Sequence, residues 1–326
     1  MSTLKYVLQR LAAGLITLFC IALMCFVLIK LLQPEASLYK NVAEVERIRR
    51  EALGYDKPIM VQFGIYLKNI VTEWDWGTSW KIHYMQPAMK VVSSRLLPSV
   101  LVNLYSILLA EPLGILLGIW AALKKNKPTD YIISTAVMIF VSVPTYVYAF
   151  VLQYFIGFKL GLFPLVVSSV YDAGGSYFTW TMLKSQILPV LALSFGIIAG
   201  QARFTRAELT EALTSEYMLL ARTKGLTRAQ ATTRHALRNA MVPILPGIIS
   251  DFLSILGGSI IIEQIFSIPG VGKLYLQAVN MLDYDVFMVD AIFYAALGII
   301  SMILVDLSYG FIDPRVRMGA KKSEAV

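Results

Sequence analysis

Residues 99–122 read SVLVNLYSILLAEPLGILLGIWAA, and Glu111 is the only charged side chain in this run. About 20 helical residues cross the hydrocarbon core of a bilayer, because an α-helix rises about 1.5 Å per residue. Backbone groups in lipid have to be hydrogen-bonded within their own segment, which favours a helix over an open strand. The stretch therefore predicts a membrane-spanning helix.

Five other runs have the same character, and they occupy residues 10–31, 131–158, 187–204, 243–266 and 287–311. Of the whole chain, 57% is hydrophobic and 15% is charged, whereas about a quarter of a soluble domain is charged. The first run is longer than the apolar part of a signal peptide and no small-residue cleavage site follows, so we expect it to be retained. The sequence predicts an all-α integral membrane protein with six transmembrane helices.

The distribution of lysine and arginine predicts the orientation, because cytoplasmic loops are enriched in both. This rule places both termini in the cytoplasm. The net charge of +8 follows from that topology and from attraction to anionic lipid, so we expect no nucleic-acid partner. The chain divides into an N-terminus with helix 1 (1–31), a long extracytoplasmic helical segment (32–98), a core of helices 2–6 (99–313) with a cytoplasmic loop (205–242), and a cytoplasmic tail (314–326).

The extracytoplasmic segment has the pattern of a small helical unit. Residues 42–54 are typical of a short helix ended by Gly54. After Pro58 an apolar stripe recurs at helical spacing, formed by Ile59, Phe63, Tyr66, Leu67 and Ile70. Tryptophan favours the membrane–water interface, and three surround a glycine turn: Trp74, Trp76 and Trp80. Two compatible interpretations stay open: a cap lying on the outer membrane surface, and a docking surface for an external partner.

The cytoplasmic stretch 221–240 reads ARTKGLTRAQATTRHALRNA and contains no acid. Gly225 suits the position after a helix end, and Thr227 with Gln230 fits a capping box that begins a new helix. We expect this second helix to end near Asn239, before Pro243. It would carry a cationic face and a small-residue face, formed by Arg234 and Arg238 and by Ala229, Thr232, Ala236 and Ala240. Such a helix–turn–helix favours a rigid knob that docks into a groove over a solvated loop.

Polar and helix-bending residues within the apolar runs are candidates for a translocation path. Glu111 lies near the middle of its run, where a charge costs about 3 kcal/mol. Two interpretations of Glu111 stay open: it lines a translocation path, or it has a structural role, either as one member of an interhelical pair or as a protonated acid in the core. Asp251 lies nearer the cytoplasmic end of its run. Pro144 should kink the third run, with Ser142 and Thr145 able to satisfy the freed backbone groups.

Several kinds of chemistry are not indicated by the sequence. The string SIPGVGKL (267–274) has Ser267 and Leu274 where a phosphate-binding loop requires glycine and serine or threonine. The two histidines, His83 and His235, fall on opposite sides of the predicted membrane. No nucleophile with a base and no metal-ligand spacing can be argued, so we expect no intrinsic catalysis, no metal and no cofactor bound by this chain.

The stretch ARTKGLTRAQATTRHALRNAMVPILP resembles the cytoplasmic coupling loop of ABC-transporter permeases, in the version typical of peptide and nickel importers. LKYVLQRL, LGYDKPIMVQFGIYL, WGTSW, GGSIIIEQIFSIPGVGKL and DPRVR extend the resemblance over nearly the whole chain. The general Glu-Ala-Ala pattern of such loops is not fully kept, because Leu219 and Leu220 replace the glutamate and the first alanine. The chain is similar to the first permease subunit of dipeptide and oligopeptide importers.

This resemblance implies a type I ABC importer permease in a bacterial or archaeal cytoplasmic membrane. The chain would pair with a second, homologous permease, and a solute-binding protein would deliver peptide from outside. Two ATP-binding subunits would use ATP and Mg²⁺ below it. The implied coupling residues are Ala221, Arg222, Lys224, Gly225, Leu226, Arg228, Arg234, His235 and Arg238. Candidates for the path are Glu111, Pro144, Thr145 and Asp251, and candidates for binding-protein contact are Trp74, Trp76, Trp80, Asp283 and Asp285.

Other functions stay open at this point. The same architecture could import nickel chelates, glutathione or oligosaccharides, because the binding protein makes most of the selection in such systems. An autonomous secondary transporter would need no ATPase, and it would predict inverted repeats and discontinuous helices, which the sequence does not show. A membrane-embedded enzyme would need a convergent catalytic set.

Overall fold

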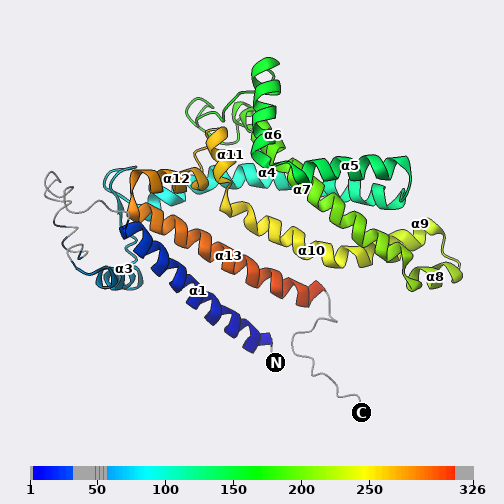
Figure 1. Cartoon of the computed structure of the whole chain (residues 1–326), viewed down its shortest axis with the longest axis horizontal. Helices are drawn as coiled ribbons and strands as arrows, with labels where there is room; N and C mark the ends of the chain where they lie inside the picture. Colours follow the sequence, from blue (N-terminus) through cyan, green and yellow to red (C-terminus); the bar gives the residue numbers. More distant parts are fainter. Residues whose placement is uncertain (1–2, 32–47, 49–50, 52–53, 55–56, 313–326) are drawn as a thin grey trace, which may run out of the picture.

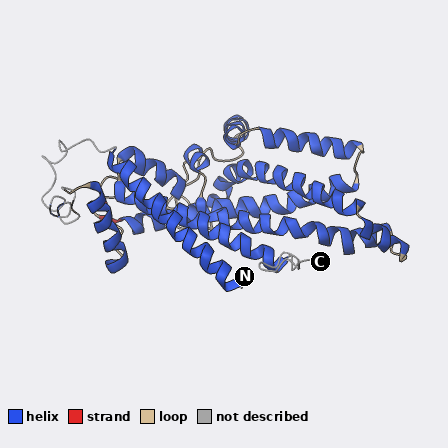
Figure 2. Cartoon of the chain, turned by 60° about the horizontal axis from the view of Figure 1, so that its bottom comes forward, coloured by secondary structure: helices blue, strands red, loops and turns tan. Residues whose placement is uncertain are grey.

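The computed structural model describes residues 3–31, 48, 51, 54 and 57–312, and nearly all of them are helical (Figure 2). The predicted short helix within 42–54 and the predicted tail 314–326 lie almost wholly outside the described residues. Five described helices are long and apolar enough to cross a membrane, or six if one bent pair forms a single span. The predicted all-α architecture of several spans is confirmed.

The long helices run beside one another along most of the molecule (Figure 1). They are α1 (Thr3–Leu31), α4 (Ala88–Leu123), α7 (Trp180–Thr214), α10 (Leu237–Ser254) and α13 (Tyr284–Ile312). At one end lies a two-stranded antiparallel hairpin, β1 (Thr78–Ser79) and β2 (Gln86–Pro87), which we call the hairpin end. At the other end lie α8 (Glu216–Thr223) and α9 (Arg228–Ala231), which we call the knob end.

The closest packing in the core is between α4 and α7. A Cβ added at Gly118 would lie 2.6 Å from the carbonyl oxygen of Ala202, and one at Gly114 would lie 2.7 Å from Gln201 Cβ. Small residues four apart let two helix backbones approach in a membrane. Hydroxyl groups cross the same interface, since Ser194 Oγ donates to Ser106 O at 3.2 Å. The α4–α7 pair therefore forms a close-packed axis on which the other spans lie.

The predicted kink in the third run is confirmed, and it is a break rather than a bend in one helix. Helix α5 (Pro128–Ser142) and helix α6 (Thr145–Leu152), which continues as a π-helix (Gln153–Lys159), meet at 98°. Pro144 stands between them with extended backbone. Ser142 Oγ donates to Met138 O at 2.7 Å. The hydroxyl of Tyr148, which the pattern did not single out, donates to Phe140 O at 2.9 Å.

Helix α3 (Ile59–Glu73) packs on α1 and α13 through the predicted apolar stripe. Phe63 and Tyr66 are buried, and the ring of Phe26 on α1 lies 5.3 Å from the first and 5.6 Å from the second. The remaining stripe residues pack against the same cluster: Ile59, Leu67 and Ile70. The described part of the segment before α4 is thus a helical unit with its own core.

One predicted span boundary is wrong. The run 243–266 was expected to be one span, but the continuous helix covers Arg228–Gly257. It ends in a single 3-10 turn (Ile255–Gly257), and α11 (Ile260–Ile265) and α12 (Val271–Met281) follow separately. Gly258 has φ +61°, a conformation that suits glycine and ends the helix. As a result Asp251 lies near the hairpin end of its span, and not near the opposite end as expected.

Candidate functional site

The knob, which we define as residues 216–236, has the predicted helix–turn–helix form. Gly225 has φ +86°, and its N–H donates to Arg222 O at 3.0 Å. Thr227 Oγ1 accepts from Gln230 N at 3.3 Å, and Thr227 N donates to Gln230 Oε1 at 3.0 Å. Both bonds of the expected capping box are present. The turn fixes the angle between α8 and α9.

The small-residue face of the knob is buried inside this chain, which corrects part of the expectation. Residues of α8, α9 and the following π-helix (Thr232–Ala236) pack with Leu209 and Ala212 at the end of α7. Ala229 is exposed and Ala231 is buried. The buried small residues of the knob are Ala221, Ala231, Thr232 and Ala236, and Ala240 at the start of α10 is buried beside them. This face attaches the knob to α7 and is not available to a partner.

The opposite face of the knob is cationic and partly apolar, and nothing within the described chain covers it. Leu219 is 69% exposed and Leu220 is 55% exposed, at the two positions that depart from the general coupling-loop pattern. Leu226 and His235 are half-buried. A groove of about 550 Å³ lies beside α8 and includes Glu216, Leu219, Arg222 and Arg228. The exposed coupling candidates are Arg222, Lys224, Gly225, Arg228, Arg234 and Arg238.

The helix that leaves the knob does not end near Asn239, and this prediction is wrong. It continues through Pro243 and Pro246 as one helical path from Arg228 to Gly257. Proline is tolerated in membrane helices because neighbouring groups and local π-turns satisfy the freed carbonyls. The knob is therefore built directly on a membrane-spanning helix, without a loop between them.

Two of the four path candidates lie on helices that pack together, since α4 carries Glu111 and contacts α10, which carries the half-buried Asp251. Glu111 is 4% exposed. Pro144 and Thr145 lie at the break between α5 and α6.

Asp283 and Asp285, predicted to contact the binding protein, have a structural position that the sequence did not predict. Asp283 accepts hydrogen bonds from Ser79 Oγ at 2.6 Å and from the backbone N–H groups of Lys81 and Ile82 at 3.0 and 2.9 Å. Asp285 Oδ2 accepts from Thr78 N at 2.8 Å. Both carboxylates are buried. They attach the hairpin to the start of α13, so they are not presented for direct contact with an external protein.

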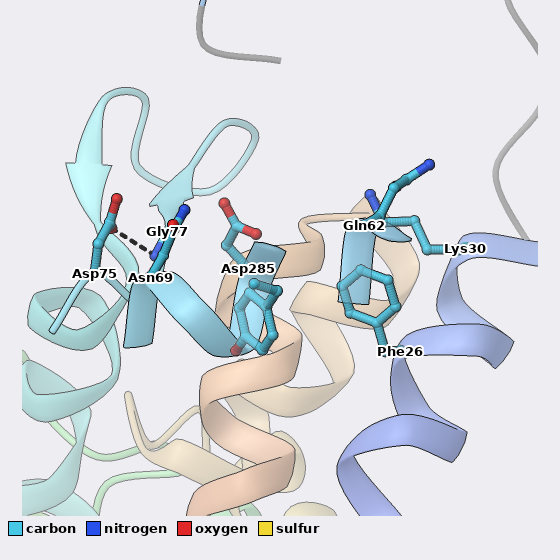
Figure 3. Close-up of a pocket in the computed structure, with 8 residues that line it drawn as sticks. Phe26, Lys30, Gln62, Asn69, Asp75, Gly77 and Asp285 are labelled. Atoms are coloured by element: carbon cyan, nitrogen blue, oxygen red, sulfur yellow. Dashed lines mark hydrogen bonds between the residues drawn. The ribbon is translucent and has the colours of Figure 1, made fainter. Parts of the chain in front are cut away.

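Beside this attachment lies a small pocket of about 20 Å³, room for a single water molecule (Figure 3). Gly77 N donates to Asp75 Oδ1 at 2.9 Å at its rim, and Lys30 Nζ lies 5.4 Å from the Phe26 ring centroid. Burial, with the nearby carboxylates of Asp285 and Asp75, raises the pKa of the Tyr66 phenol, which stays protonated. The pocket is too small for a peptide.

The predicted tryptophans lie around the same hairpin. Trp74 is 70% exposed, and its ring meets the half-buried Trp76 edge-on with centroids 5.4 Å apart. Trp80 is half-buried and meets Tyr84 at 6.1 Å. Of the predicted outer contact residues, Trp74 therefore offers the largest exposed surface.

Glu263 is a structural centre that the sequence analysis did not select. It is buried and accepts from Ser99 Oγ at 2.6 Å and from the backbone N–H of Lys273 at 2.8 Å. A Cβ at Gly270 would lie 2.5 Å from its Oε1, so the SIPG turn closes around this carboxylate. An acid placed between a GGS and a PG turn is the signal that could have identified it.

No group of three or more His, Cys, Asp or Glu side chains placed to hold a metal ion occurs among the residues searched, which are those the structure describes. A bundle of long apolar helices with a cationic helix–turn–helix built on one span is the arrangement of a membrane transport permease.

Comparison with known families agrees with this class. Residues 114–318 match the family described as binding-protein-dependent transport system inner membrane component. Residues 3–88 match the N-terminal component of the same systems. The chain belongs to this permease family. Together with its apolar helices, this makes it a multi-pass membrane protein, and it gives no support to an autonomous transporter.

Individual relatives cover almost the whole chain. The dipeptide transport system permease protein DppB of Lactococcus lactis is 34% identical over 96% of this chain and 99% of its own length. DppB of Bacillus subtilis is 34% identical over 97% and 99%. The glutathione transport system permease protein GsiC of Escherichia coli K12 is 31% identical over 96% and 99%.

A solved structure shares the fold. An amino acid ABC transporter chain aligns with a TM-score of 0.51 at 20% identity, over 68% of this chain and 94% of that one.

Proposed function

We propose that the chain is the first permease subunit of an ATP-driven ABC importer of short peptides in a bacterial cytoplasmic membrane. It would form half of the translocation pathway beside a second, homologous permease. A solute-binding protein would deliver the peptide at the hairpin end, and two ATP-binding subunits would dock at the knob end, where both termini would lie. The relatives named for dipeptide and glutathione transport support a peptide substrate.

The observation that carries the proposal is the continuity between the knob and a membrane span. A displacement applied to α8 and α9 passes to α10 without an intervening flexible loop. Nucleotide binding in a docked subunit can then bias the equilibrium between inward- and outward-open states, which is coupling in the thermodynamic sense. The chain contains no phosphate-binding loop in its sequence, so the energy would come from its partners.

The exposed face of the knob fits a docking role. Leu219 and Leu220 would enter an apolar groove of the ATP-binding subunit, and Arg222, Lys224 and Arg228 would pair with acidic groups or carbonyls at its rim. Ala221 would act indirectly, because it is buried in the joint with α7. The knob therefore divides its residues between attachment to the chain and contact with the partner.

At the hairpin end, contact with the binding protein would use Trp74 and the edge of Trp80. Asp283 and Asp285 would act through the hairpin that they hold and not by direct contact. The two tryptophans would thus supply the exposed aromatic surface, and the two aspartates would keep the hairpin beneath it in place.

The test is co-purification followed by reconstitution. The tagged chain should bring down a second permease and ATP-binding subunits, and the complex should import trialanine into proteoliposomes only with ATP and binding protein. Leu219→Asp and Arg222→Glu should lower recovery of the ATP-binding subunits, while Tyr171→Asp, on an exposed loop far from the knob, should not. Import of trialanine by the chain alone, without ATP, would refute the proposal.

A further inference from the structure

The helical path that carries the knob ends at two successive glycines. It runs from Arg228 to Gly257, and Gly258 follows with φ +61° and ψ 179°. A Cβ added at Gly257 would meet only two side chains, at 3.8 and 3.9 Å, so packing leaves this residue room to turn. Glycine has the widest range of backbone angles, and two glycines in a row therefore form a joint that can bend.

The carboxylate of Glu263 lies directly against this joint. A Cβ at Gly258 would lie 2.5 Å from Glu263 Oε1, and the backbone N–H of Ser259 donates to the same oxygen at 3.4 Å. The second oxygen, Oε2, accepts from the backbone N–H of Lys273 in the first turn of α12 at 2.8 Å. One side chain, 2% exposed, thus joins the end of the helical path to α12.

Two side chains of α4, one helical turn apart, attach the same joint to the bundle. Ser99 Oγ donates to Glu263 Oε1 at 2.6 Å and accepts from the backbone N–H of Val271 at 3.0 Å. Asn103 Nδ2 donates to the carbonyl oxygen of Ile255 at 3.2 Å. This carbonyl belongs to the last turn of the path, where a helix leaves acceptors without a partner of its own. We call Ser99, Asn103 and Glu263 the clasp.

Beyond the clasp, α12 leads to the start of α13 at the hairpin end (Figure 1). α12 ends at Met281, and Asp283 follows it and accepts hydrogen bonds from Ser79 Oγ and from two backbone N–H groups of the hairpin. A short helix that is fixed at both ends moves as one body. A displacement of α10 that crosses the clasp would therefore reach the hairpin, where we propose that peptide is delivered.

We propose that Glu263 is a positioning residue that carries the movement of the knob-bearing helix across the glycine joint to α4 and α12. This inference rests on the proposed function. With the clasp closed, the end of the path and the outer ends of α4 and α12 move together. Without it, rotation about Gly257 and Gly258 absorbs the displacement. Docking of the ATP-binding subunits is kept, because the clasp lies at the opposite end of the path from the knob.

The first test measures transport by the complete assembly in proteoliposomes, with its second permease, ATP-binding subunits and binding protein. We expect Glu263→Leu to lower trialanine uptake about tenfold, the effect of losing hydrogen bonds to a charged group. Glu263→Gln keeps an acceptor oxygen and should restore part of this uptake. ATP hydrolysis and recovery of the subunits should stay near the wild-type values in both variants.

Ser99→Ala removes the α4 side of the clasp, and it should also lower uptake. The double variant with Glu263→Leu should be no slower than Glu263→Leu alone, because both changes break one unit. Ser185→Ala is the matched control. It removes a buried hydroxyl that likewise donates one hydrogen bond and accepts one from a backbone N–H, outside the clasp, and it should leave uptake unchanged.

The second test measures movement at the outer end, which a purely structural role of Glu263 would leave unchanged. Asn280 is exposed on α12, and Asn280→Cys, with Cys20 and Cys25 replaced by serine, reports through its rate of reaction with a membrane-impermeant maleimide. In the complex with an intact clasp, this rate should differ between the nucleotide-free and the nucleotide-trapped states. In Ser99→Ala and in Glu263→Leu the difference should be lost, while the nucleotide-free rate is kept.

A nucleotide-dependent difference of wild-type size in both variants would overturn the transmitting role of Glu263 and leave the importer proposal standing. Loss of subunits from both variants, with the Ser185→Ala complex intact, would also overturn it, because the clasp would then serve assembly and not transmission. If the wild-type complex imports no trialanine with ATP, the proposed function itself fails.

Discussion

At the scale of single residues, Gly225 shows how one backbone angle sets the shape of the knob. Its φ of +86° is accessible to glycine, and a Cβ there would meet nothing within 4 Å. Glycine is therefore required at position 225 because of its backbone conformation, and not because a side chain would clash with a neighbouring residue. A β-branched side chain would be strained in this region, whereas asparagine visits it readily.

We expect Gly225→Val to lower ATP-driven uptake at least fivefold, because about 1–2 kcal/mol of backbone strain would shift the α8–α9 turn. Gly225→Asn should retain most of the uptake, and Gly247→Ala, at a position with open space and an ordinary φ, serves as control. The measurement is peptide uptake per ATP hydrolysed in proteoliposomes. Equal values for Val and wild type would show that the turn geometry is unimportant.

Asp283 gives a second prediction at this scale. Its carboxylate accepts from one hydroxyl and three backbone N–H groups of the hairpin. Asp283→Ala should leave these donors unsatisfied and destabilise the hairpin locally by about 2–4 kcal/mol. Hydrogen exchange of residues 78–84 should rise accordingly. Asp172→Asn, which alters an exposed acid bonded only to its own loop, should leave that exchange unchanged.

At the scale of elements, the α4–α7 axis depends on close approach at Gly114 and Gly118. We expect Gly118→Leu to force the helices apart, because even its Cβ would lie 2.6 Å from a carbonyl oxygen. The melting temperature of the assembled complex should fall by several degrees, and recovery should drop. Gly64→Ala on α3, where a Cβ meets nothing, should do neither. A stable Gly118→Leu complex would contradict the packing described here.

The elements also show what the sequence could and could not predict. Long apolar runs, the Gly225 turn, the capping box at Thr227 and the break at Pro144 have local causes, and local patterns predicted them. The end of the helical path that contains α10 depends on a contact between residues distant in the sequence. The backbone at Gly258 lies close to the Glu263 carboxylate, which accepts a hydrogen bond from Ser99 on α4. No local pattern reports such a contact, and the span boundary was therefore misplaced.

The candidate site likewise has features that local sequence patterns predict and features that depend on contacts between distant residues. The cationic face of the knob was predictable from composition, whereas the burial of Ala231 in place of Ala229 follows from a π-helix that shifts the register. Glu111 and Asp251 lie on α4 and α10, which pack together although they are far apart in the chain, so the sequence could name both acids but not the packing of their helices. The attachment of the hairpin by Asp283 is equally non-local.

At the scale of the whole molecule, one helical path connects the knob to the hairpin end of α10 and contains Asp251. A rigid helix transmits displacement, and a flexible one absorbs it. If the chain couples ATP hydrolysis to transport, the continuity of residues 228–257 is the feature that does so. This claim is separate from the identity of the substrate and from the docking residues.

The most direct measurement is uptake and ATP hydrolysis by a complex with two glycines inserted between Asn239 and Ala240, compared with the same insertion in the turn between Lys124 and Lys127. The account predicts that the first insertion lowers peptide uptake at least tenfold while binding-protein-stimulated ATP hydrolysis stays within about twofold of wild type, since docking is kept and transmission is lost. The control insertion should preserve both activities. Wild-type uptake with the interrupted helix would contradict the account.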